Sequence, residues 1–259
     1  MDKHDLIIEF KEILKEIYKQ EGLNCLRGIN YDYTVNGKQI LQWHNEVTRK
    51  CAIKNCGSFN YNQNIDDLIT CSDEIMYFTG QLFLFRPYIN NPLLYPIIKP
   101  STIVYQNLQN YEATCYYMIT DVVSEKLYNY WDRIGDLIAS FFSDLIEPKD
   151  VFFPKIIQII PEKYQKIKGY KWLKEFKENE YVKLNSKRKQ SVHYITTSTS
   201  FKYRRFSSSS NKEETEKWVS DRNAIPDFFK NQIELTVEGL FMTLSFLEEV
   251  EKDLFKDVD

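Results

Sequence analysis

Arg188 and His193 are the residue types with which a protein can cleave RNA without a metal ion. They lie five positions apart in the lysine-rich segment LNSKRKQSVHYITTSTS, residues 184–200. RNA supplies its own nucleophile, the 2′-hydroxyl group, so the protein needs a base whose pKa is near neutrality, which histidine provides. It also needs a fixed positive charge where the phosphorane develops, and a guanidinium binds such oxygens through two hydrogen bonds. We therefore predict that Arg188 stabilises the phosphorane and that His193 is the general acid or base.

The spacing of the two residues has a consequence for how a site would be built. On one ideal helix, five residues turn the two side chains about 140° apart, so they would not form a compact pair. A two-fold homodimer would instead place this segment of each subunit around one phosphate. His193 lies where its helix should end, and the negative end of the helix dipole favours the imidazolium that a general acid requires. The alternative is an ordinary polar pair on a solvated helix face.

Cations and aromatic side chains interleave around this pair. Cations bind phosphates and aromatic faces stack on unpaired bases, a combination suited to single-stranded RNA. The substrate-binding residues that we predict are Asn185, Lys187, Lys189, Ser191, Tyr194, Arg204 and Arg205. The alternative is a solvated lysine face beside aromatic residues of the core, because aromatic residues make up 15% of the chain.

A metal site receives little support from the sequence. Cys51 and Cys56, with His44 and Cys71 nearby, suggest zinc, but structural zinc sites use two matched sets of closely spaced ligands, and the sequence has no second set. We expect no metal and no cofactor, and we interpret His44 as a core histidine on the apolar side of its helix. The sequence contains no Gly-rich phosphate loop and no HExxH motif.

Charge and cysteine usage limit the class of protein. The net charge of −3 argues against a protein that coats duplex nucleic acid, so RNA would be bound through a local patch. The five cysteines are odd in number and scattered, and residues 1–20 alternate charged and apolar residues, unlike a signal peptide. The most apolar stretch, residues 75–85, is far shorter than the roughly 20 residues that span a bilayer. We predict a reduced, cytoplasmic protein that does not insert into a membrane.

The elements that must position these residues are predicted to be helices. Only 8 Gly and 8 Pro occur in 259 residues, which favours few, long elements. The fold class that we predict is all-α, an up-and-down bundle of long helices with minor hairpin or loop additions. It would be one domain over residues 1–259, whose N-terminal helices (about 3–85) pack on a core of residues 101–255.

The periodicity of apolar residues locates the individual elements. Helices are predicted over 3–19 (ended by Gly22), 38–52, 65–85, 162–178, 180–194, 211–221 and from Pro226 to about 255. The run 101–144 is too long for one straight helix and should form two that break near Ser124. Asn36-Gly37 predicts a hairpin turn. A loop is predicted over 57–63, and a loop or a short hairpin over 195–210. Ser210 and Glu213 have the spacing of a capping box for the helix over 211–221.

A largely helical chain with Arg-x4-His on a late helix resembles the HEPN superfamily, and the motif falls on RKQSVH, Arg188 to His193. The resemblance implies a helical bundle, commonly dimeric, and a metal-independent ribonuclease of a bacterial toxin–antitoxin or antiphage system. The implied partners are RNA, a second copy of the chain, and an antitoxin or defence-system protein. Active members often carry Asn, Asp or His directly after the arginine, whereas this chain has Lys189. The alternative is a non-catalytic HEPN-like dimeric module that binds RNA, a nucleotide or a protein.

Overall fold

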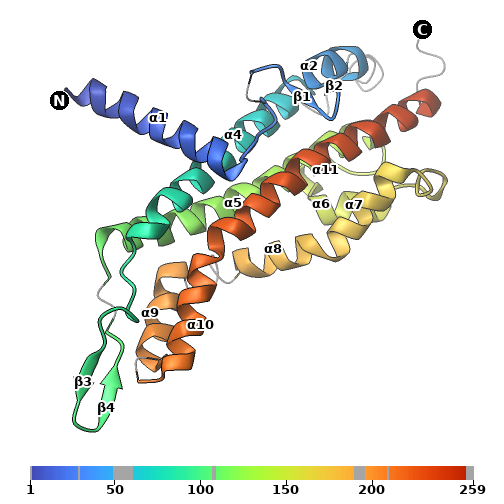
Figure 1. Cartoon of the computed structure of the whole chain (residues 1–259). Helices are drawn as coiled ribbons and strands as arrows, with labels where there is room; N and C mark the ends of the chain where they lie inside the picture. Colours follow the sequence, from blue (N-terminus) through green and yellow to red (C-terminus); the bar gives the residue numbers. More distant parts are fainter. Residues whose placement is uncertain are drawn as a thin grey trace. The chain divides into compact units, whose positions relative to one another are not determined.

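The computed structural model describes residues 2–28, 30–48, 61–106, 109–189, 196–208 and 210–254. Its longer helices are α1 (Lys3–Glu21), α4 (Tyr61–Phe85), α5 (Tyr111–Ala139), α7 (Lys168–Glu178), α8 (Glu180–Lys189), α9 (Thr197–Ser208), α10 (Lys212–Asn223) and α11 (Ile225–Leu254) (Figure 1). Two shorter helices are α2 (Ile40–Trp43), which continues as a π-helical turn over His44–Thr48, and α6 (Phe153–Ile159). Strands in the described ranges form two small antiparallel hairpins, β1 (Thr34–Val35) with β2 (Lys38–Gln39) and β3 (Ile97–Lys99) with β4 (Thr102–Val104). The predicted all-α class is confirmed.

The chain divides into two compact units, each built from three separate segments. Unit 1 comprises Met1–Leu23, Met76–Glu125 and Ser186–Asn231. Unit 2 comprises Asn24–Ile75, Lys126–Asn185 and Gln232–Asp259. The chain passes from one unit to the other at five points. The first lies after α1, between Leu23 and Asn24, and the other four fall inside helices, so that α4, α5, α8 and α11 each contribute residues to both units. The packing of residues 3–85 on 101–255 as one domain stays a prediction.

Unit 2 has a core of large aromatic rings around Trp131 of α5, which is fully buried. The ring of Trp131 stacks on Phe176 of α7 at 3.9 Å between centroids, and Phe153 of α6 lies 5.2 Å away. Helix α11 approaches this cluster through Gly239, where a β-carbon would lie only 2.4 Å from Trp131 Cη2. The Tyr130 hydroxyl donates to a carbonyl of α11, Thr236 O, at 2.8 Å. Close approach and aromatic packing therefore join α5, α6, α7 and α11 within this unit.

Unit 1 is held by contacts of α5 with α9 and α10. Tyr117 of α5 stacks on Phe201 of α9 at 5.0 Å, and Phe201 meets Trp218 of α10 edge to face at 6.1 Å. The buried Tyr116 hydroxyl donates to Arg222 O at 2.6 Å and so satisfies one of the carbonyls left over at the end of α10. These contacts fix α9 and α10 on the same part of α5.

The first helix and the first hairpin follow local sequence signals. The backbone of Gly22 is left-handed (φ 64°), and its N–H ends α1 by bonding Lys19 O, as the sequence predicts. Asn36 and Gly37 both have positive φ (47° and 80°), which is the geometry that a two-residue hairpin turn requires. The predicted Asn36-Gly37 turn is confirmed.

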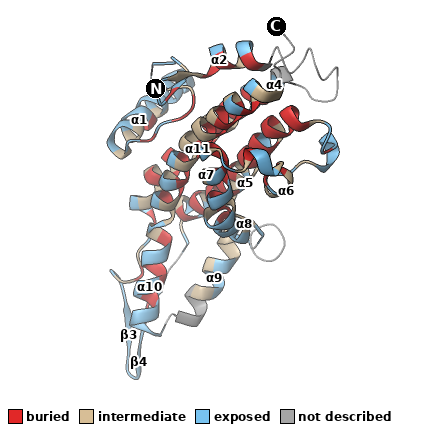
Figure 2. Ribbon diagram, turned by 90° about the vertical axis from the view of Figure 1, so that its right-hand side faces the viewer, coloured by how far each residue is buried: buried red, intermediate tan, exposed pale blue. Residues whose placement is uncertain are grey.

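The expected helix break near Ser124 is wrong, because α5 continues from Tyr111 to Ala139. Ser124 is accommodated inside the helix, where its hydroxyl donates to the carbonyl of Thr120, four residues earlier, at 2.9 Å. The helical pattern predicted from 101 onward is also wrong at its start. Residues 97–104 form the β3–β4 hairpin instead, which is largely exposed (Figure 2).

The loop or short hairpin predicted over 195–210 is wrong for residues 197–208, which form α9. Tertiary contacts override the low helix propensity of this Thr- and Ser-rich segment. Thr197 donates through its hydroxyl to Asp121 of α5 at 2.5 Å, and Phe201 packs against Tyr117. The capping signal of α10 is also displaced by one residue, since Asn211 and not Ser210 accepts from the backbone, at Glu214 N.

Two other predicted helices are right only in part. The helix predicted over 38–52 is a strand at 38–39 and helical over 40–48, and residues 49–52 lie outside the described residues. The helix predicted over 162–178 begins only at Lys168, after a separate 3-10 turn at Glu162–Tyr164. Residues 190–194 of the helix predicted over 180–194 lie outside the described residues. Helix α4 ends at Phe85 before Arg86-Pro87, but begins at Tyr61, so the loop predicted over 57–63 is wrong at residues 61–63. Pro226 lies in the first turn of α11, as predicted. In the described ranges, no helix combines the length and the apolar composition that a membrane crossing requires.

Candidate functional site

Helix α8 carries the motif arginine in its last turn. Tyr181 and Leu184 are buried and anchor the first part of the helix, and Lys183 bonds Glu180 one turn earlier at 2.6 Å. Three consecutive cations, Lys187, Arg188 and Lys189, end the described part of the helix. The negative end of the helix dipole favours cations at this position, so the sequence concentrates positive charge where the helix tolerates it best.

Lys187 has the most unusual environment of the three cations. Its Nζ lies 3.3 Å from the centroid of the Phe228 ring, which belongs to α11 and to the same unit. The side chain as a whole is exposed, but the ring shields the ammonium group from water, and this desolvation lowers the pKa of Lys187. A cation over an aromatic face is also held in place electrostatically. Phe228 therefore fixes the ammonium group of Lys187, the residue that precedes Arg188 in the chain.

The neighbouring residues of α8 differ in exposure. Arg188 is half-buried, Lys189 is exposed and Asn185 is half-buried. Lys187, Arg188 and Lys189 follow one another in the chain, so the helix spreads their side chains around its axis. The geometry provides a cationic end of α8 able to bind phosphate oxygens.

Arg204 lies on α9, which is also part of unit 1. Its guanidinium bonds Asp221 of α10 at 2.6 Å and lies 5.8 Å from the Phe201 ring centroid. Both members of the ion pair remain substantially exposed, so the pair is weak and a phosphate can compete for Arg204. Arg205 follows it on the backbone of α9.

Several predicted site residues lie outside the described residues. They are His193, Ser191 and Tyr194, and the side chain of Arg205 is likewise not described. Of the predicted constellation, the structure therefore places Asn185, Lys187, Arg188 and Lys189 on α8 and Arg204 on α9. The pairing of Arg188 with His193 stays a prediction.

The predicted core histidine, His44, is half-buried in the π-helical turn, and burial lowers its pKa. Cys51 and Cys56 lie outside the described residues. Among the residues that the structure does describe, no three His, Cys, Asp or Glu side chains converge as a metal site would require.

Two contacts at this site have no signal in the sequence. Phe228 lies 41 positions after Lys187, and Asp221 lies 17 positions after Arg204. Neither distance corresponds to a local helix spacing, so the contacts follow only from the packing of α8, α9, α10 and α11 segments in unit 1.

Comparison with known proteins identifies one family. Residues 58–248, most of the chain, match the family described as Cthe2314-like HEPN. The matched range includes Arg188, His193 and the basic segment around them. No curated protein and no solved structure matches the chain.

Proposed function

The chain belongs to the Cthe2314-like HEPN family of the HEPN superfamily, and on this premise we propose that it is a metal-independent endoribonuclease. HEPN domains commonly dimerise and bind RNA. The observation that carries the proposal is the cationic end of α8, where the half-buried Arg188 precedes His193 by five residues within the matched range.

The reaction that these residues support is an internal transesterification. A neutral imidazole of His193 takes the proton of the 2′-hydroxyl as its oxygen attacks the adjacent phosphorus. The Arg188 guanidinium stabilises the negative charge of the phosphorane with two parallel hydrogen bonds. The P–O5′ bond then breaks, and an imidazolium protonates the leaving oxygen. The products are a 2′,3′-cyclic phosphate and a 5′-hydroxyl end, and no water or metal takes part.

A homodimer would supply both protonation states at once. With two copies of the segment around one phosphate, one His193 would be the base and the other the acid. Lys187, Lys189 and Asn185 of α8, Ser191 and Tyr194 of the motif segment, and Arg204 and Arg205 of α9 would bind the flanking phosphates and bases. A bacterial toxin–antitoxin or antiphage system is the setting that we propose, with an antitoxin or defence protein as partner.

The test is cleavage of a single-stranded RNA by the purified chain in the presence of EDTA. His193→Ala and Arg188→Ala should each reduce the rate by about 10²-fold or more, because each removes a group that acts only in the transition state. His4→Ala, an exposed histidine of α1, is the matched control and should leave the rate unchanged. An RNA with one 2′-deoxy nucleotide should resist cleavage at that position. Cleavage that survives His193→Ala would remove the proposal.

The second candidate is a non-catalytic RNA-binding module, and Lys189 favours it, because active HEPN members often have Asn, Asp or His at that position. This candidate predicts RNA binding by the wild-type chain without any cleavage, and binding that His193→Ala leaves unchanged. Lys189→Asn provides a direct comparison, since it should create or increase cleavage if the lysine is what prevents it.

A further inference from the structure

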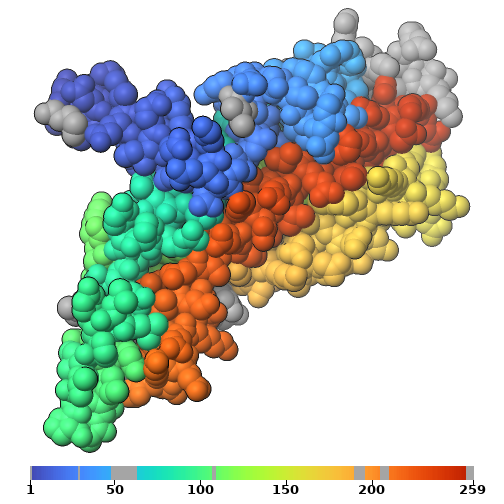
Figure 3. All heavy atoms as spheres, in the orientation of Figure 1, coloured from blue at the N-terminus to red at the C-terminus, as the bar shows by residue number. Residues whose placement is uncertain are grey.

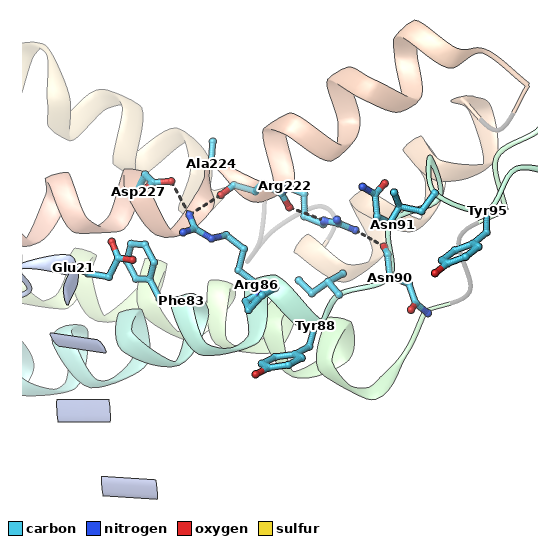
Figure 4. A pocket seen from close by; sticks show the side chains of 14 residues that line it. Glu21, Phe83, Arg86, Tyr88, Asn90, Asn91, Tyr95, Arg222, Ala224 and Asp227 are labelled. Atoms are coloured by element: carbon cyan, nitrogen blue, oxygen red, sulfur yellow. Dashed lines mark hydrogen bonds and ion pairs between the residues drawn. The ribbon is translucent and has the colours of Figure 1, made fainter. Parts of the chain in front are cut away.

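A cavity of about 920 Å³ lies within unit 1, and Arg188 is not among the residues that line it. It is bounded by the end of α4, by the connector of residues 86–95 that follows it, and by the turn between α10 and α11 (Figure 4). In the space-filling view, the connector lies against the start of α11 and the end of α10 (Figure 3). The volume is within the range of about 300–1,000 Å³ that small-molecule sites occupy.

The cavity wall contains a buried guanidinium, that of Arg222, whose side chain is only 2% exposed. It donates to Asn90 O at 3.0 Å and to Asn223 Oδ1 at 3.3 Å, and it lies 5.0 Å from the Trp218 ring centroid. It also forms a hydrogen bond with Tyr117. These partners carry no charge, and no ion pair of the described residues includes Arg222. A guanidinium stays charged in a protein, and burying it without an anion is unfavourable. An anionic ligand would supply the missing countercharge.

A second guanidinium, that of Arg86, lies at the same cavity and is more exposed. It pairs with Asp227 at 2.9 Å, donates to Asn223 O at 3.4 Å, and lies over the Phe83 ring at 4.8 Å. Glu21 also lines the cavity, on the side of Phe83, away from Arg222 (Figure 4). Because Asp227 is the more exposed partner of the ion pair, Arg86 can exchange it for a stronger anion at little cost.

The connector adds planar and amide groups to these charges. Tyr88 and Tyr95 line the cavity and are 64% and 80% exposed, so their rings are accessible to a ligand. The amides of Asn90 and Asn91, which lie between the two tyrosines in the sequence, also line the cavity (Figure 4). Exposed aromatic faces stack on bases, and side-chain amides bond their edges.

From this combination we infer that the cavity binds a nucleotide, with its phosphate between Arg222 and Arg86 and its base stacked on Tyr88 or Tyr95. The ligand is either a free nucleoside monophosphate or the phosphorylated end of a single strand, which have the same chemistry. This inference goes beyond the proposed cleavage of RNA and does not depend on it, since the cavity is lined by other residues than Arg188 and the cations of α8 and α9 that the proposed cleavage uses.

The test is isothermal titration calorimetry of the full chain with each of the four nucleoside 5′-monophosphates, with the matching nucleosides and with inorganic phosphate. At least one nucleotide should bind tenfold more tightly than both its nucleoside and phosphate, a difference of about 1.4 kcal/mol. Arg86→Gln should weaken this binding at least tenfold, and Tyr95→Ala at least fivefold. Both side chains are accessible, so these variants test the cavity without removing the buried Arg222.

Two variants serve as matched controls. Arg133→Gln breaks a comparable pair, Arg133–Asp136 at 2.9 Å, on α5 in unit 2. Tyr111→Ala removes a 75% exposed ring of unit 1 that does not line the cavity. Both should bind the nucleotide as the wild type does.

The source of the ligand is resolved with a single-stranded deoxyoligonucleotide, which a ribonuclease cannot cut, with and without a 5′-phosphate. Tighter binding of the phosphorylated strand than of the free nucleotide assigns the cavity to strand ends, and the reverse assigns it to free nucleotides. The inference is overturned if nucleotides bind no better than nucleosides or phosphate, if neither source binds, or if Arg86→Gln and Tyr95→Ala retain the wild-type affinity. If His193→Ala abolishes RNA cleavage but leaves nucleotide binding unchanged, the nucleotide site is independent of the residues that cleave RNA.

Discussion

Replacing Gly239 with alanine should destabilise the protein, although alanine is the better helix former. A β-carbon at Gly239 would lie 2.4 Å from Trp131 Cη2, 2.9 Å from Trp131 Cζ3 and 3.4 Å from Trp172 Cη2. The Trp131 ring cannot move away, because it is fully buried and stacks on the Phe176 ring with 3.9 Å between the centroids. Overpacking of this kind costs about 1–3 kcal/mol, whereas alanine gains up to about 1 kcal/mol in helix propensity. We expect a net loss of about 1–2 kcal/mol in the free energy of unfolding, measured by urea denaturation.

A double-mutant cycle tests the steric reason for this loss. Trp131→Phe shortens the ring that occupies the space, so Gly239→Ala should cost at least about 1 kcal/mol less in that background. An equal cost in both backgrounds would show that Trp131 is not what excludes the β-carbon. A stabilising Gly239→Ala in the wild-type chain would refute the packing that brings α11 against α5 in unit 2.

Two further predictions concern a buried thiol and an exposed ion pair. Burial and a hydrogen bond with Asp73 raise the pKa of Cys25 to about 11 from 9.0, so the folded state holds the proton more tightly. This raised pKa contributes to the free energy of unfolding. The contribution is fully present below pH 9 and is lost as the pH rises toward 11. At pH 10.5, relative to pH 8, the wild type should lose about 2 kcal/mol more unfolding free energy than Cys25→Ala, and an equal loss would contradict this assignment. Asp221→Asn removes the carboxylate that competes with phosphate for Arg204, and it should tighten RNA binding severalfold in fluorescence anisotropy at low salt. Unchanged affinity would exclude Arg204 as a phosphate ligand.

Local signals in the sequence predict elements whose ends are set locally. Gly22 ends α1 because the left-handed conformation suits glycine, and Asn36-Gly37 forms its turn for the same reason. Predictions from the sequence are wrong where contacts between residues far apart in the chain determine the structure. Ser124 satisfies its hydroxyl within α5 instead of breaking the helix, and Thr197 begins a helix because Asp121 of α5 accepts its hydrogen bonds.

For the candidate site too, the sequence predicts the residues but not their surroundings. Residue types and spacing identify Arg188 and the cations beside it, because these properties belong to one short segment. The environment of Lys187 could not be predicted, since the ring that shields it comes from α11. Arg222 carries no motif at all, and its burial without a carboxylate partner becomes visible only when the connector after α4 is placed beside α10.

The division of the chain into interleaved segments has a consequence for biosynthesis. Unit 2 receives its last segment from residues 232–254, which supply Gly239 to the Trp131 cluster and Glu248 to an ion pair with Lys38, 210 positions earlier. During translation, the segments that precede α11 therefore emerge before their partner exists, and unit 2 completes its core only when this helix has left the ribosome. For the same reason, neither unit can be expressed as one continuous fragment, and a fragment ending before residue 232 would expose the rings around Trp131 to chaperones and proteases.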